Sequence, residues 1–166
     1  MIDLLLNPEQ DLYFNNSDDT SALKSLDPEN LRLAETLLKE LQVKAGSPKV
    51  VVIEAYVSMF GRKNGAELAT VKLGELLKSK PDYAPAMLAL SVAKFLTKKA
   101  TEAKNFLKIL SKRPYSSEYA DELEKAWLLY ADSFIAISKF DNAEEMLRKC
   151  LKHNQSCGNI LNFSFF

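Results

Sequence analysis

The strongest constraint on the fold lies toward the end of the sequence, where large apolar residues precede a small one. Trp127, Tyr130 and Phe134 recur at spacings of three and four residues, so they share one face of a helix. Beyond a short gap, Ala143 and Cys150 mark the apolar face of a second helix. Two helices that cross at a small residue form a unit that recurs about every 34 residues. Such units stack into a curved surface, which favours protein binding over catalysis.

The alanine recurs earlier in the chain as Ala103 and Ala69. Each of the three alanines is followed, four and seven residues later, by core positions on the same helical face. These positions are Leu73 and Leu76, Leu107 and Leu110, and Leu147 and Cys150. Upstream of the first two alanines lie helices with large apolar residues, namely Ile53, Tyr56 and Phe60, and Met87 and Leu90. This pattern is typical of the tetratricopeptide repeat (TPR).

The spacing sets the boundaries of about three units. We place them at 50–83, 84–117 and 124–157. The first two abut, whereas six residues separate the second from the third, and Pro114 to Ser117 has the composition of a loop there. Three units are the usual minimum for a stable solenoid.

Flanking segments complete the predicted domain at 27–157. Asp27 and Pro28 have the chemistry of a helix start, and the following apolar stripe ends before Gly46. That helix is expected to seal the first unit. Residues 1–26 are predicted to be an acidic leader, in loop or partly ordered form, and 158–166 to be an incomplete repeat or divergent tail. The expected fold is all-α: a TPR-type α-solenoid of about three helix-turn-helix units, with an N-terminal sealing helix and an incomplete final repeat.

Charge and composition disfavour several classes of function. Basic and acidic residues both number 22, so no global field recruits nucleic acid or anionic lipid. The acids are concentrated at the start, where residues 1–30 carry seven of them against one lysine. No apolar run approaches the roughly 20 residues that span a bilayer, and two cysteines make no disulfide framework. We expect a cytoplasmic protein with no cofactor, nucleic acid, direct membrane insertion or small-molecule substrate.

One group of residues has the chemistry of a metal or thiol site. Cys150, His153 and Cys157 would share a helical face if the helix continued to Cys157. A structural zinc site needs four ligands, and His153 is the sole histidine of the chain. Cys150 also occupies a core position of its unit. We therefore favour a structural role and predict no metal, and keep a metal or thiol site as an alternative.

In TPR stacks, the first helix of each unit lines the concave surface. The positions there that packing does not use form the candidate partner groove, here called the candidate row: Glu54, Ser58, Arg62, Leu88, Val92, Phe95, Lys125, Leu128, Asp132 and Ile135. Its second and third units are largely apolar, as suits an amphipathic helix or a segment of a large assembly. The alternative, that Leu88, Val92, Leu128 and Ile135 pack inside the chain, stays open. A stand-alone, cochaperone-like TPR peptide adaptor is the alternative function, but the second unit lacks the basic clamp that it needs.

The third unit carries a more specific resemblance. The segments 124–132 and 139–157 resemble the tetratricopeptide repeat protein 21 family, and the likeness extends more loosely over 27–117. Members of that family are large TPR subunits of intraflagellar-transport complex A. The resemblance implies a non-enzymatic scaffold in the cytoplasm and the cilium, at the axoneme or the ciliary base. Its implied partners are protein subunits of a ciliary transport complex that supports retrograde transport, cilium assembly and delivery of proteins to the cilium. The chain looks like a truncated or alternative form.

Overall fold

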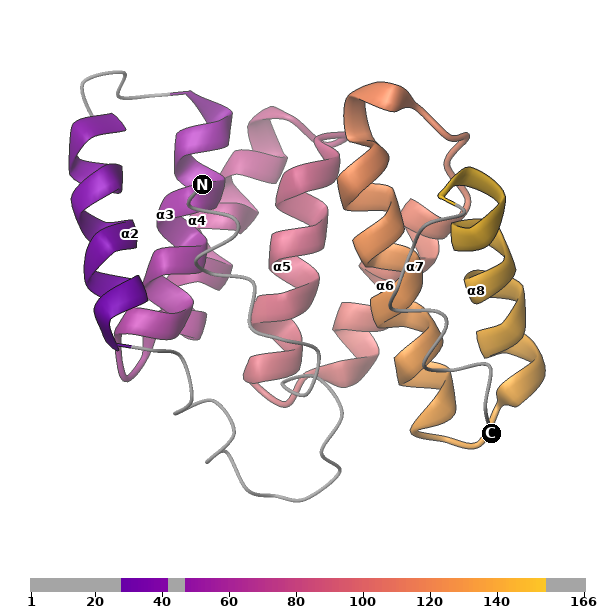
Figure 1. Ribbon diagram of the computed structural model, residues 1–166. Coiled ribbons are helices and arrows are strands. Elements are labelled where there is room, and N and C mark those ends of the chain that lie inside the picture. The colour runs from indigo at the N-terminus through magenta and orange to yellow at the C-terminus, as the bar shows by residue number, and fades with distance from the viewer. Residues whose placement is uncertain (1–27, 42–46, 155–166) are drawn as a thin grey trace.

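The structure, a computed structural model, describes residues 28–41 and 47–154 (Figure 1). The predicted leader, the helix cap at Asp27, the incomplete last repeat and Cys157 lie outside the described residues. Seven α-helices and one 3-10 turn make up the described part, which contains no strand. They are α2 (Pro28–Leu41), α3 (Pro48–Gly61), α4 (Gly65–Ser79), α5 (Ala84–Leu96), α6 (Ala100–Ser111), η4 (Ser117–Tyr119), α7 (Ala120–Ile135) and α8 (Phe140–His153).

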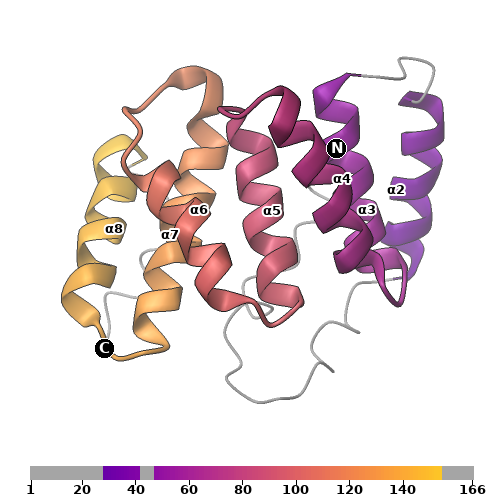
Figure 2. The ribbon, with the colours of Figure 1, turned by 180° about the vertical axis from the view of Figure 1, so that it is seen from behind.

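The helices are arranged in adjacent pairs. Each helix packs on the next one along the chain, and α5 also contacts α3 and α7 across the repeat. Figure 1 shows α5 and α7 toward the viewer, and Figure 2, from behind, brings α4 and α6 forward. Thus α3, α5 and α7 form one layer, and α4 and α6 form the other. This arrangement confirms the predicted helical solenoid.

Small residues allow the paired helices to approach closely. Ala69 and Ala103 are fully buried and Ala143 is 3% exposed, as expected of residues where two helices cross. Trp127, the largest side chain of the third unit, is also buried. The spacing argument therefore identified the contact points of all three pairs.

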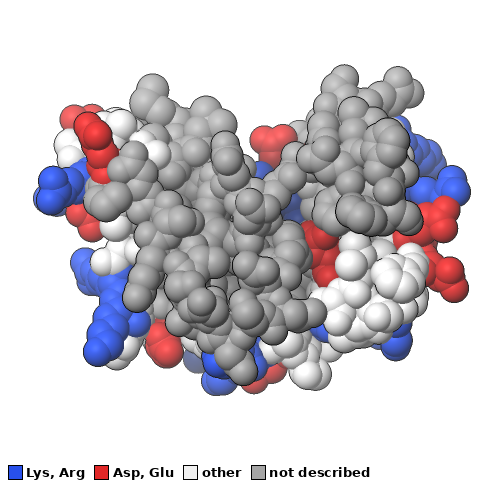
Figure 3. All heavy atoms as spheres, turned by 60° about the horizontal axis from the view of Figure 1, so that its bottom comes forward, with Lys and Arg blue, Asp and Glu red and all other residues white. Residues whose placement is uncertain are grey.

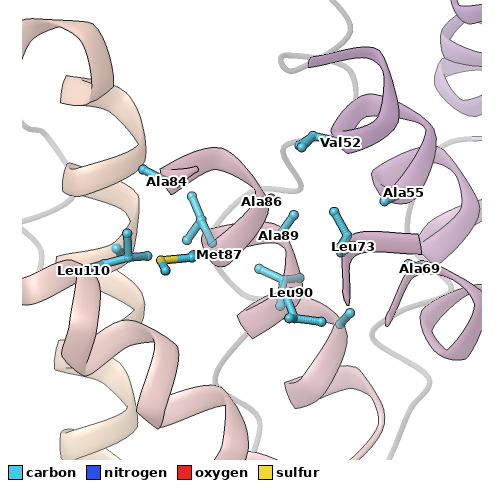
Figure 4. Close-up of a cluster of buried hydrophobic side chains, with 14 of the residues drawn as sticks. Val52, Ala55, Ala69, Leu73, Ala84, Ala86, Met87, Ala89, Leu90 and Leu110 are labelled. Carbon is cyan, nitrogen blue, oxygen red and sulfur yellow. The ribbon is translucent and has the colours of Figure 1, made fainter. Parts of the chain in front are cut away.

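The core consists of three apolar clusters. The main cluster runs without a break from α3 to α7; Figure 4 shows Leu73 and Leu90 within it, and Met87 beside Leu110. A second cluster joins α7 to α8 around Trp127. The third joins α2 to α3 through Ala34, among other residues, which is the packing that the predicted sealing helix requires.

The central helix α5 differs from the outer helices because it is apolar on every side. Nine of its residues are buried, including four alanines and Leu88. A helix that is hydrophobic all round is stable only when other elements surround it. By contrast, α8 buries only Ala143, Met146 and Cys150, so one stripe of that helix faces the core.

The turns within the units use special backbone geometry. A Cβ on Gly65 would lie 1.6 Å from the carbonyl oxygen of Ser58, so the first turn requires glycine. Lys98 and Ser138 take the left-handed conformation in the turns of the second and third units, with φ of 60° and 56°. Because neither is glycine, each carries some backbone strain.

The link between the second and third units is more structured than the sequence predicted. Pro114, Tyr115 and Ser116 are non-helical, but Ser117 already begins η4, and α7 starts at Ala120. The Ser116 hydroxyl accepts a hydrogen bond from the backbone N–H of Glu118 and caps this turn. The loop prediction missed the turn because a capping serine is also a common loop residue.

Candidate functional site

The candidate row begins on α3, where its side chains are already engaged. Glu54 is half-buried and forms an ion pair with Lys72 Nζ at 3.3 Å. The Ser58 hydroxyl donates a hydrogen bond to the carbonyl oxygen of Gly65 at 3.5 Å. Arg62 is exposed at the C-terminal end of the helix. At this end of the row, only Arg62 extends into solvent.

On α5 the row is part of the core. Leu88 and Val92 are 4% and 3% exposed and belong to the main apolar cluster. Phe95 is half-buried at the edge of the same cluster. The second unit therefore offers little surface at these positions, in agreement with the interpretation that they pack inside the chain.

On α7 the row is more open. Lys125 is exposed, and Leu128 and Ile135 are half-buried at the margin of the second cluster. Asp132, between them on the same helical face, is only 5% exposed. Burial raises the pKa of the Asp132 carboxyl from its usual 3.8 to about 7. The structure thus places the ten predicted residues on three adjacent helices, with a perturbed carboxyl at the third-unit end.

Cationic side chains join the units through backbone carbonyls, which sequence reasoning did not find. Arg113 Nη1 donates to the carbonyl oxygen of Asp82 at 2.7 Å, and Arg113 Nη2 lies 3.1 Å from the Asp82 carboxylate. Lys104 Nζ donates to the carbonyl oxygen of Ser133, and Lys149 Nζ to that of Ser111, both at 3.3 Å. No local pattern marks contacts that span 29 to 38 residues.

The residues considered for a metal or thiol site have other contacts. Cys150 is fully buried, and its Sγ lies 3.8 Å from the carbonyl oxygen of Glu124. The His153 ring stacks on Tyr115 with centroids 4.0 Å apart and on Trp127 at 5.7 Å. Within residues 28–41 and 47–154, no group of three or more His, Cys, Asp or Glu side chains could hold a metal ion.

A shallow pocket of about 320 Å³ lies at the link between the second and third units. Its lining residues are Asp82, Ala84, Arg113, Pro114, Ser116, Tyr119 and Leu123. The guanidinium of Arg113, one of the lining residues, already hydrogen-bonds to Asp82 and to Met87 Sδ, the latter at 3.6 Å. The pocket therefore has no convergent set of available polar groups of the kind that holds a small ligand.

The remaining charged groups are interspersed on the surface. Figure 3 shows Lys and Arg mixed with Asp and Glu around the margin of one face. Exposed pairs such as Arg148 with Glu144 connect neighbouring turns of a single helix. Among the described helices, none has the length and apolar character needed to cross a bilayer.

Comparison with known proteins identifies a family of relatives. The family model described as "Tetratricopeptide repeat protein 21 C-terminal ARM domain" matches residues 33–164. The chain is 34% identical to human tetratricopeptide repeat protein 21B and 31% identical to mouse tetratricopeptide repeat protein 21A, over 95% of its length in both cases. A tetratricopeptide repeat protein 21 homolog of Caenorhabditis elegans is 24% identical over the same share. The chain spans 13% of the length of the human and mouse relatives.

Proposed function

Because the chain belongs to the tetratricopeptide repeat protein 21 family, we propose that it acts as a non-enzymatic protein-binding scaffold in ciliary transport. The observation that carries the proposal is the family match over 33–164, a range that the stacked helical pairs largely fill. Stacked helical repeats form extended surfaces that bind other proteins. The helical scaffold itself is shared with the family, whereas the ciliary role is the step that we add.

The proposed role is to contribute contacts to intraflagellar-transport complex A. In that role the chain supports retrograde transport along the axoneme, cilium assembly and delivery of proteins to the cilium. Its partners are protein subunits of the complex, and its location is the cytoplasm and the cilium. Of the candidate row, the part on α7 supports this role best, because Lys125 is exposed and Ile135 is only half-buried.

A pull-down from ciliated cells tests the proposal. The tagged chain is expected to recover subunits of the transport complex. Lys125→Glu combined with Ile135→Asp changes the face of α7 and should reduce that recovery. Arg148→Ala, on the exposed surface of α8, is the matched control and should recover as much as the unmodified chain. Circular dichroism must show equal helical content in all three proteins.

Two results would count against the proposal. Failure of the unmodified chain to recover any subunit of the complex would remove the ciliary role. Equal recovery by the α7 double variant would instead leave the role in place and move the contact away from the candidate row.

A further inference from the structure

Asp132 differs from the other buried polar residues because no described residue forms a hydrogen bond with its side chain. Four polar or charged residues of the described chain are buried, and three of them are serines. The hydroxyl of each serine donates to a carbonyl oxygen of its own helix, as Ser91 does to Leu88 at 2.7 Å. Within the described chain, the Asp132 carboxylate makes no hydrogen bond and no ion pair. Buried polar groups are normally satisfied, so this exception requires an explanation.

Asp132 lies on a side of α7 that belongs to neither of the two apolar faces of that helix. One face of α7 packs on α8 through Trp127 and Ala131. A second face packs on the preceding unit through Ala126 and Leu129. Asp132 projects between these faces, on the side that carries the candidate row. The carboxylate is therefore directed toward the proposed binding side and not into a helix crossing.

Among the residues that the structure describes, no cation compensates the Asp132 carboxylate. An ionised carboxylate only accepts hydrogen bonds, so a basic side chain is its natural partner. Lys104 Nζ, on the neighbouring helix, donates to the carbonyl oxygen of Ser133, and Lys125 is exposed two turns away along α7. Burial is the sole cause of the raised pKa of Asp132, and no neighbouring charge contributes to the shift.

The oxygens of Asp132 are not completely enclosed. Among the described side chains, Trp127 Nε1 is the one polar atom that is both fully enclosed and without a hydrogen bond. The Asp132 oxygens also lack a hydrogen bond, so they must retain contact with solvent. The carboxylate thus keeps a small exposed area, on the face of α7 that also carries the half-buried side chains of Leu128 and Ile135.

We propose that Asp132 receives a lysine or arginine side chain from an amphipathic helix of a partner protein. This inference rests on the proposed scaffold function and specifies the chemistry of the partner. Leu128 lies one turn before Asp132 and Ile135 one turn after it, so they contact apolar residues on either side of the partner's basic residue. The charge of the carboxylate selects the cation, and its low exposure makes the pairing specific, because water competes poorly there.

Binding of synthetic peptides to the full chain tests the pairing. The probes are fluorescein-labelled, helix-forming peptides of about 18 residues, or five turns. They are identical except for a central lysine, norleucine or glutamate, with leucines one turn to either side. We expect the lysine peptide to bind at least tenfold more tightly than the norleucine peptide, and the glutamate peptide to bind most weakly.

Asp132→Asn keeps the shape of the side chain and removes its charge. It should abolish the preference for lysine over norleucine, while Asp121→Asn, an exposed change on the same helix, should leave it intact. Affinity for the lysine peptide should also fall between about pH 8 and pH 5.5 as the carboxyl takes up a proton. Asp132→Asn should show no such fall. Equal helical content by circular dichroism confirms that the variants are folded.

Equal binding of the lysine and norleucine peptides, or binding of neither, overturns the pairing. These outcomes do not depend on ciliary partners, so they are separate from the pull-down result. Recovery of transport-complex subunits together with equal peptide affinities would leave the scaffold function standing and remove Asp132 as a cation receptor. A lysine preference without recovery of those subunits would support Asp132 as a cation receptor and remove the ciliary role.

Discussion

The second and third units share a helix-pair geometry but hold their helices by different means. The pair α5–α6 lies within an apolar cluster that extends into its neighbours, and α5 is buried on all sides. The pair α7–α8 has a separate cluster around Trp127. At the margin of this pair, Lys149 hydrogen-bonds to Ser111 and the His153 ring stacks on Tyr115. The difference separates two roles. The second unit is the structural centre of the described chain, whereas the third leaves more of its candidate row exposed.

Trp127→Ala offers the largest test of this contrast. Since Trp127 is the largest member of the third-unit cluster and is buried, we expect a loss of about 3–5 kcal/mol in the free energy of unfolding. Urea denaturation followed by circular dichroism measures it. Trp127→Phe is the control and should cost less, because it keeps most of the apolar volume and its Nε1–H has no partner to lose. An unresolvable change in Trp127→Ala would mean that α8 does not depend on this cluster.

The pH dependence of stability isolates the perturbed carboxyl of the third unit. The unfolded chain releases the Asp132 proton near the usual pKa of 3.8, whereas the folded chain holds it to about 7. The protonated form therefore favours folding, and the free energy of unfolding should fall as pH rises from 4 to 7, by about 3–4 kcal/mol from this group. The measurement is the difference in pH profile between the unmodified chain and Asp132→Asn. Identical profiles would show that Asp132 is solvated.

Replacing Lys149 tests the polar attachment of the third unit to the second. Lys149→Met keeps the aliphatic stem and removes the hydrogen bond to the carbonyl oxygen of Ser111 together with the exposed ion pair to Glu145, so we expect a cost of about 1–2 kcal/mol, most of it from the Ser111 contact. The measurement is the denaturation midpoint. Lys152→Met, an exposed change on the same helix, is the control and should have little effect. Equal midpoints for the two variants would show that apolar contacts alone hold the third unit on the second.

The smallest effect is expected on the outer surface of α8. Arg148 and Glu144 are both well exposed, so Arg148→Ala should cost only about 0.3–0.5 kcal/mol. High salt should reduce that cost further. A loss of more than about 1 kcal/mol in the free energy of unfolding, measured in thermal melts, would contradict the assignment of this face as solvent-exposed.

Local pattern predicted the helical pairs well, because their determinants are close in sequence. Spacings of three, four and seven residues identified Ala69, Ala103 and Ala143, and all three are buried. The family was likewise recognisable from the third unit. The candidate row stays a prediction as a binding site, since its ten positions were chosen from helical phase alone.

Burial along the row could not be derived from the sequence. Val92 and Asp132 hold equivalent places in their units, and both are buried, although one side chain is apolar and the other charged. The exposure of such positions depends on how successive units rotate against one another, which local spacing does not encode. The contact of Arg113 with Asp82 crosses 31 residues and was missed for the same reason.

The separation of the third-unit cluster from the main one has a mechanical consequence. Among the described helices, α8 buries its apolar stripe mainly against α7. A pulling force on the C-terminal end of α8 should peel that helix away before it disturbs the continuous cluster. In a force-extension experiment, the first rupture event would then correspond to the detachment of α8 alone. The helices from α3 to α7 would unfold later, in one cooperative step.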